Sequence, residues 1–198
     1  MTLGVTLLRL TGELLEWSPR FFGRAPGGGL AIVGIAWLVP VVGLLFGYRL
    51  AGAGVRPASL ARAAGLPLAA LVLLPTVAGL ASRLGLGTTT TAHLTTWAVL
   101  AVVAVGVGFA AWPALGRVLL AYAVLARVPV VAVMWAAIRW SWDTHYDAPP
   151  PGFPSMVPLL RWWWTGVVPQ LTIWIAWTVV VGAVFGALGW YLASRQAR

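Results

Sequence analysis

The residues best suited to chemistry lie in one short polar segment, residues 139–147. Asp143, His145 and Asp147 alternate along it, so an extended backbone would direct all three side chains to one side. Carboxylate and imidazole groups gathered in this way are donors that metal ions use. The alternative is an ordered loop held by ion pairs to neighbouring arginines. We favour the ordered loop and predict no bound metal, because no second cluster of donors accompanies these three.

A second candidate is Arg127, near the middle of an apolar run and two residues before Pro129. A charged side chain at membrane depth costs about 2.5–3.5 kcal/mol and therefore normally faces protein or water. Arg127 could serve a small-molecule or ion carrier as a ligand site, together with the Asp143–Asp147 cluster. The alternative is a structural buried contact or a side chain that extends towards the membrane surface, and this structural role is the favoured interpretation.

Tryptophan is unusually frequent, with 13 residues in 198. An interfacial belt explains most of them, because the headgroup region accommodates an apolar ring with one N–H to satisfy. The alternative is a flat aromatic site for a quinone, pigment or lipid, with His93, His145 or Gln170 as its polar partner. No cofactor is predicted, whereas bound lipids are expected. Five tryptophans are predicted to contact partners: Trp140, Trp142, Trp162, Trp163 and Trp164.

The composition is that of a membrane protein. Hydrophobic residues make up 61% of the chain, charged residues only 9%, and the mean hydropathy is +0.91, whereas a soluble domain carries roughly 25% charged residues. The net charge of +9 comes from arginines without any lysine. These arginines are scattered singly, which favours anionic lipids over nucleic acid as the partner. The lysine-free, Ala- and Gly-rich composition suggests a GC-rich, bacterial genome.

The elements that must position these residues are predicted to be apolar helices. Residues 30–192 are expected to form an all-α, polytopic transmembrane bundle, because its apolar runs approach the roughly 20 residues that cross a bilayer. A Trp/Pro-rich loop is expected over 139–166, with a separate short helix ended by Gly166, and a basic tail follows over 193–198. Pro67 and Pro75 predict a kinked or incomplete second span. The five spans are placed near 30–48, 66–81, 94–112, 118–138 and 171–191.

The N-terminal region, residues 1–29, is predicted to contain an amphipathic helix and a glycine-rich linker. Over residues 2–17, Arg9, Glu13 and Glu16 fall opposite an apolar stripe. A helix lying in the membrane interface is favoured, and a helix that docks onto a partner protein is the alternative. The stripe consists of Leu3, Leu7, Leu10, Leu14 and Trp17.

Two small-residue motifs indicate close helix contacts. Gly43 and Gly47 in the first span, and Gly182 and Gly186 in the fifth, have the GxxxG spacing that lets helix backbones approach. The motifs could join helices within this bundle or bind a partner, and the sequence favours neither.

The chain lacks the short motifs of common enzymes, including HExxH, a phosphate-binding loop and a nucleophile elbow. It has four acidic residues, none within a predicted span, whereas ion-coupled transporters usually need intramembrane carboxylates. We therefore predict a protein that is not an enzyme.

One segment resembles a known family. Five spans are predicted after an amphipathic N-terminal region, and the sequence GRVLLAY at residues 116–122 leads into a span that contains Pro129. This pattern resembles the Yip (Ypt-interacting protein) domain family. The resemblance implies a five-span protein linked to membrane trafficking or lipid handling, and it brings no catalytic residues.

The leading hypothesis is a non-enzymatic accessory or scaffold subunit of a larger bacterial membrane complex, such as a respiratory or photosynthetic one. The alternatives are the small-molecule or ion carrier and the Yip-like membrane-shaping protein. The expected location is the bacterial inner membrane. Arginines outside the spans divide six to six between its two sides, so the positive-inside rule does not fix the orientation. An N-terminus inside is favoured, because a surface helix followed by basic residues suits the anionic leaflet.

Overall fold

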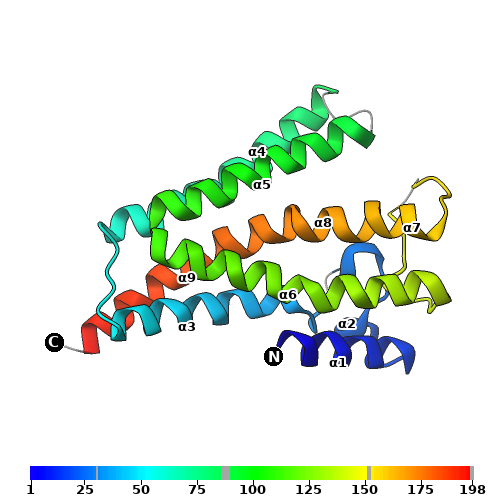
Figure 1. The fold of residues 1–198 in the computed structure, drawn as a ribbon, viewed down its shortest axis with the longest axis horizontal. Coiled ribbons are helices and arrows are strands. Elements are labelled where there is room, and N and C mark those ends of the chain that lie inside the picture. Colours follow the sequence, from blue (N-terminus) through cyan, green and yellow to red (C-terminus); the bar gives the residue numbers. More distant parts are fainter. Residues whose placement is uncertain (30, 86–89, 151–152, 197–198) are drawn as a thin grey trace. The chain divides into compact units, whose positions relative to one another are not determined.

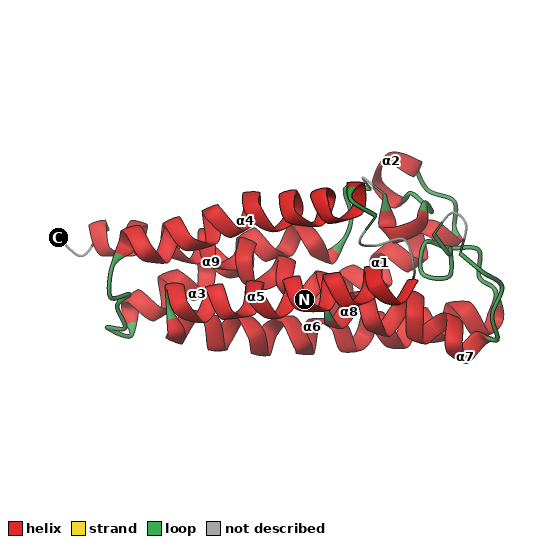
Figure 2. Ribbon diagram, turned by 90° about the horizontal axis from the view of Figure 1, so that it is seen from above, coloured by secondary structure: helices red, strands yellow, loops and turns green. Residues whose placement is uncertain are grey.

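The computed structural model describes residues 1–29, 31–85, 90–150 and 153–196, which are 79% helical and contain no strand (Figure 2). The all-α fold class is therefore confirmed. Figure 1 labels the longer elements. In chain order the elements are α1 (Thr2–Leu14), α2 (Pro19–Phe22), η1 (Pro26–Gly28), η2 (Ile35–Trp37), α3 (Leu38–Gly52), α4 (Leu60–Arg83), α5 (Thr90–Ala111), α6 (Pro113–Trp140), α7 (Pro158–Arg161), the π-helix η3 (Trp162–Val167), α8 (Val168–Leu171) and α9 (Ile173–Gln196).

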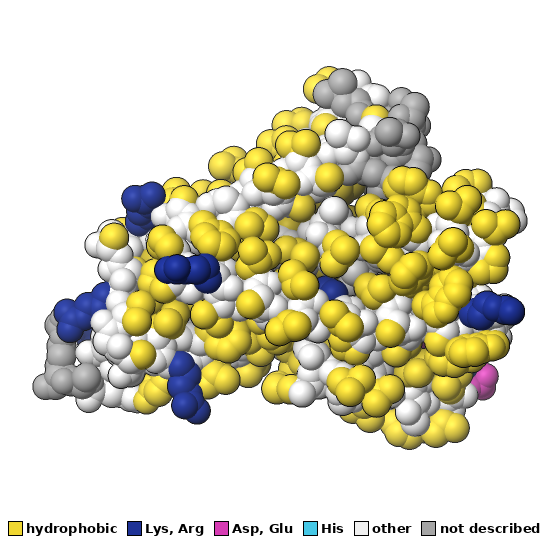
Figure 3. All heavy atoms as spheres, viewed as in Figure 1, with side chains coloured by type: hydrophobic (Ala, Val, Ile, Leu, Met, Phe, Trp, Pro, Cys, Tyr) yellow, Lys and Arg dark blue, Asp and Glu magenta, His cyan; other side chains and the backbone are white. Residues whose placement is uncertain are grey.

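Four helical segments are long and apolar enough to cross a membrane: Ile35–Gly52, Leu60–Arg83, Pro113–Trp140 and Pro158–Gln196. A shorter apolar helix, Thr95–Ala111, lies within α5. Hydrophobic side chains cover most of the face drawn in Figure 3, and the arginines on it are scattered. These features suggest a membrane protein with several transmembrane helices.

The first two long helices differ from their predicted bounds. The first begins at Ile35 rather than near residue 30, because the preceding stretch is a loop whose carbonyls bind Arg9. The second is a continuous helix of 24 residues that contains Pro67 and Pro75. Its N-terminus is capped by Ser59, whose side chain accepts a hydrogen bond from the Arg62 N–H at 3.3 Å. The two prolines therefore do not interrupt it, as is common in membrane helices.

The Trp/Pro-rich region contains more helix than expected. The helical run that begins at Pro158 passes through Gly166 as a π-helix and continues, with one turn residue at Thr172, to Gln196. Gly166 does not end it, because it lies inside the helical run and does not adopt the positive φ of a helix-ending glycine. Among the described residues, the non-helical part of the region is limited to 141–150 and 153–157.

The chain divides into two compact units. Unit 1 comprises Met1–Leu38 and Val124–Leu171, and unit 2 comprises Val39–Ala123 and Thr172–Arg198. The core of unit 1 contains Val130, Met134, Ala137 and Tyr146. The polar candidate residues with described side chains all lie in unit 1, whereas the glycine motifs lie in unit 2.

Unit 2 is held together by close apolar packing. Helices α4 and α5 lie side by side (Figure 1), and both contact α9. The two GxxxG motifs face each other: a Cβ on Gly43 would overlap the backbone of Gly182, and a Cβ on Gly47 would overlap that of Gly186. The structure thus uses both motifs for helix packing inside the chain, which is one of the two roles that the sequence left open.

Candidate functional site

The first polar site is a buried ion pair on α1. Arg9 and Glu13 lie one helical turn apart and are 6% and 0% exposed, with Arg9 Nε donating to Glu13 Oε1 at 2.7 Å. The remaining guanidinium nitrogens donate to backbone carbonyls at 2.9 Å, those of Val33, Gly23 and Gly28. Arg9 therefore ties α1 to the loop that precedes α3.

The same carboxylate binds a loop that is distant in sequence. His145 donates its backbone N–H to Glu13 Oε2 at 2.8 Å, and its Nδ1 lies 2.5 Å from Glu13 Oε1. Next to it, the Tyr146 hydroxyl donates to the Thr6 carbonyl at 3.1 Å. We refer to Arg9, Glu13 and His145 as the clamp, because together they join α1, the glycine-rich loop and the loop after α6.

The clamp holds its charges in defined states at neutral pH. Burial raises the pKa of Glu13, but the hydrogen bonds from His145 and Arg9 outweigh it, so this pKa lies below its ordinary value. Burial lowers the pKa of His145, and this outweighs the hydrogen bond to Glu13. Glu13 is therefore a carboxylate beside Arg9, and a neutral His145 donates its Nδ1–H to it.

The three candidate metal donors face different partners. Asp147 accepts hydrogen bonds from the backbone N–H groups of Asp143 and Thr144, at 3.1 and 2.7 Å. Asp143 is exposed and lies 3.3 Å from Arg24, while His145 binds Glu13. No group of three or more His, Cys, Asp or Glu side chains in the described ranges could hold a metal ion. The structure thus places the three residues in an ordered loop.

The clamp determines which face of α1 points outwards. The polar residues Thr6, Arg9 and Glu13 are buried, whereas most of the leucine stripe is exposed. Leu3, Leu7 and Leu14 are each about half exposed, and Leu10 packs against the core of unit 1. A helix on a water-soluble core buries its apolar stripe, so α1 is oriented in the opposite sense.

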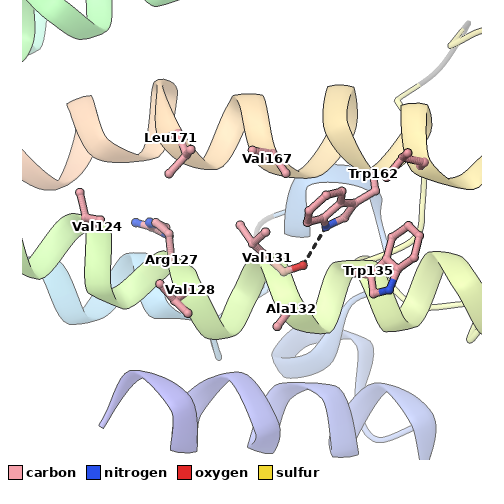
Figure 4. A pocket seen from close by; sticks show the side chains of 10 residues that line it. Val124, Arg127, Val128, Val131, Ala132, Trp135, Trp162, Val167 and Leu171 are labelled. Atoms are coloured by element: carbon pink, nitrogen blue, oxygen red, sulfur yellow. Dashed lines mark hydrogen bonds between the residues drawn. The ribbon is translucent and has the colours of Figure 1, made fainter.

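The second polar site is a groove around Arg127. A cavity of about 600 Å³ lies between the second half of α6 and residues 159–171 (Figure 4). Arg127 lines it and is 2% exposed, and its Nη1 donates to Gln170 Oε1 at 3.4 Å. Gln170 Nε2 in turn lies 3.9 Å from the sulfur of Met134. All the other lining residues are apolar or aromatic.

Two tryptophans form one end of the groove. The rings of Trp135 and Trp162 meet edge to face, with centroids 5.4 Å apart. The Trp162 indole N–H donates to the Val131 carbonyl at 2.9 Å (Figure 4). Trp162 and Val167 both belong to η3, and π-helical turns often occur at functional sites. The π-helix thus forms part of the groove wall.

The remaining predicted residues are not gathered into either site. Trp140 and Trp142 stack on each other, with ring centroids 5.9 Å apart, and Trp163 is about half exposed. His93 lies in α5, but its side chain falls outside the described residues. Arg127 and the Asp143–Asp147 cluster are not brought together: α6 extends about 20 Å beyond Arg127 before the loop with the cluster begins.

Sequence reasoning found part of each site. The spacing of Arg9 and Glu13 indicated their pairing, and Arg127 and Gln170 were both singled out. The contact between Glu13 and His145 had no signal in the sequence, because 132 positions separate the two residues.

No model of a known family, no curated protein and no solved structure matches this chain. The resemblance to the Yip domain family stays a prediction.

Proposed function

We propose that this chain is a non-enzymatic accessory subunit that stabilises a larger bacterial membrane complex, with α1 as its main docking element. The observation that carries the proposal is the reversed orientation of α1, which buries Arg9 and Glu13 and exposes Leu3, Leu7 and Leu14. Exposed apolar patches on a folded protein mark sites of protein or membrane interaction.

The buried charges favour a protein partner over the bilayer surface. A helix that lies on a membrane normally uses basic residues of its polar face to bind anionic headgroups. The charged residues of α1 are Arg9 and Glu13, and the clamp holds both inside unit 1. Covering a leucine side chain fully is worth about 1.5–3 kcal/mol. A partner helix packed on the stripe would supply this free energy.

The proposal also covers the number of spans, the position of α1 and the location of the protein. The four long apolar helices and α5 together would give five spans, and α1 would lie outside them, near the membrane interface. We propose the bacterial inner membrane, with the N-terminus inside. The Trp-rich region, with Trp140 and Trp163 exposed, would add to the docking surface.

The experiment compares two triple variants in the native host. In the first, Leu3, Leu7 and Leu14 are replaced by Ala. In the control, three exposed leucines of α4 (Leu66, Leu73 and Leu80) are replaced by Ala. Gentle purification followed by native mass spectrometry should recover the same partner subunits with the wild type and the control. The α1 variant should lose them while staying in the membrane fraction. A wild-type chain that runs only as a monomer would contradict the proposal.

A second candidate is a lipid-handling or membrane-shaping protein of the Yip-like kind. The outward leucine face of α1 favours it too, because the same face could enter the headgroup region. It makes a different prediction: the α1 variant should remodel liposomes less than the wild type, and its co-purifying subunits should be unchanged.

A further inference from the structure

Unit 2 carries a basic surface that the proposed docking function, which rests on α1, does not use. It lies where α3 ends, α4 begins, α6 begins and α9 ends. Five exposed arginines of these helix ends and of the loop between α3 and α4 form it: Arg49, Arg56, Arg62, Arg117 and Arg195. We refer to these five residues as the arginine end.

One apolar cluster of unit 2 brings these helix ends together. It contains Ala63 near the start of α4, Leu115 near the start of α6 and Ala187 in the second half of α9. Leu50, near the end of α3, and Val55, in the loop that follows, pack against this cluster. The tertiary structure therefore gathers at one end of the unit arginines that are scattered along the sequence.

Unit 2 offers these arginines no acidic side chain. The four acidic residues of the chain all lie in unit 1: Glu13, Glu16, Asp143 and Asp147. The Arg195 guanidinium carbon lies 5.0 Å from the centroid of the Tyr191 ring. The other four arginine side chains form no hydrogen bond or ion pair within the described part of the chain. The arginine end is thus a set of exposed cations without counter-charges in its own unit.

Helix dipoles account for only part of this arrangement. Arg49 and Arg195 lie in the last turns of α3 and α9, where a cation offsets the partial negative charge of the helix end. Arg62 lies in the first turn of α4, where the partial charge is positive and a cation is unfavourable. An anion from outside the chain would stabilise both the Arg62 guanidinium and the helix end beside it.

The position of the arginine end fits the headgroups of a bilayer. Each of the four long apolar segments has one terminus there. Trp190 and Tyr191 precede Arg195 by about one turn, and such aromatic rings favour the membrane interface. Arginines next to an apolar span are attracted to anionic headgroups. We propose that the arginine end binds the phosphate groups of anionic phospholipids in the leaflet beside it.

The test is a lipid competition measured by native mass spectrometry. The purified full-length chain, in a neutral detergent, is mixed with equal amounts of dioleoyl phosphatidylglycerol and dioleoyl phosphatidylcholine, which differ only in their headgroups. Wild-type protein should retain the anionic lipid about fivefold more often, because one basic residue near a membrane surface strengthens binding by about that factor. Raising ammonium acetate from about 0.05 M to about 0.5 M should reduce this preference, because salt screens exposed charges.

Two double variants remove the same charge from different parts of the chain. Arg62→Gln with Arg117→Gln should lower the preference for phosphatidylglycerol at least about twofold. The matched control is Arg20→Gln with Arg139→Gln, which removes two exposed arginines of unit 1. It should keep the wild-type preference, because unit 1 also carries the exposed carboxylates of Glu16 and Asp143, which repel an anionic headgroup.

A third variant keeps the charges and changes the side chains. Arg62→Lys with Arg117→Lys should retain the wild-type preference, because the attraction depends on charge near the membrane surface. Helix content measured by circular dichroism identifies a variant that fails to fold. If the Gln variant of the arginine end fails in this way, Arg56→Gln replaces it, because Arg56 lies in a loop.

Three results would overturn the proposal. They are equal retention of the two lipids by the wild type, equal losses of preference in the two Gln variants, and displacement of phosphatidylglycerol by a short single-stranded RNA. The last result would assign the arginine end to nucleic acid instead of lipid.

Discussion

Two buried arginines in unit 1 occupy opposite environments. Arg9 is surrounded by a carboxylate and three backbone carbonyls, and it connects three segments of the chain. Arg127 contacts a neutral amide, Gln170, and lines an apolar cavity. The first arrangement is typical of a structural contact, and the second places an arginine beside a neutral amide on the wall of an apolar cavity. Burial alone thus does not reveal the role of an arginine, whereas its surroundings do.

The largest loss of stability is expected when Glu13, the carboxylate that pairs with Arg9, is replaced. Replacing Glu13 by Ala leaves the Arg9 guanidinium buried without its carboxylate, and breaking a buried pair in this way costs about 3–5 kcal/mol. The free energy of unfolding in detergent should fall by that amount, and the amides of α1 should exchange hydrogen faster. Asp143→Asn is the control: its pair with Arg24 is exposed, so the cost should stay below about 1 kcal/mol. Equal losses in both variants would mean that the clamp has no special role.

A smaller effect is expected where unit 2 packs without buried charges. Gly47→Ala places a Cβ against the Gly186 backbone, so α3 and α9 must separate, at a cost of about 1–3 kcal/mol. The matched control is Gly106→Ala in α5, where a Cβ would meet nothing within 4 Å. There the free energy of unfolding should rise by about 0.5–1 kcal/mol, because alanine favours the helix. Similar effects at both glycines would contradict the close approach of the two motifs.

Lowering the pH should destabilise the clamp in two steps, one from His145 and one from Glu13. His145 is neutral in the folded protein and has a pKa below its ordinary value of 6.5, so unfolded chains bind more protons just below that pH. Stability should therefore fall as the pH drops below about 6.5, and again below about 4.5 as Glu13 becomes protonated. Hydrogen exchange of α1 measured from pH 8 to pH 4 should show both steps. His145→Gln should remove only the first step, and a variant that keeps it would exclude His145 as its source.

The smallest change is expected at the second arginine. Replacing Arg127 by Met and Gln170 by Leu together removes both members of their hydrogen bond and keeps much of their volume. The free energy of unfolding should change by less than about 1.5 kcal/mol, as measured by thermal and denaturant unfolding in detergent. A loss as large as that of Glu13→Ala would show that Arg127 has a structural role like that of Arg9.

The helical class and the approximate positions of the long helices could be predicted from the sequence. Runs of apolar residues are a local property, and a bilayer leaves helices as the simplest way to satisfy their backbones. The bounds were less predictable. Nothing in the run that begins at residue 30 shows that Arg9 holds the Val33 carbonyl in a loop. Likewise, nothing local in the sequence shows that the helical run beginning at Pro158 passes Gly166 without ending there.

The sequence by itself determined the composition, the apolar helices, the amphipathic pattern of residues 2–17 and the spacing of Arg9 and Glu13. Only the tertiary structure decided which face of α1 is buried, because His145 and Tyr146 reach it from more than 130 positions away. It also decided that the two glycine motifs meet each other and that Arg127 lines a groove with Trp162. Such contacts depend on how distant helices pack, and no local pattern encodes that packing.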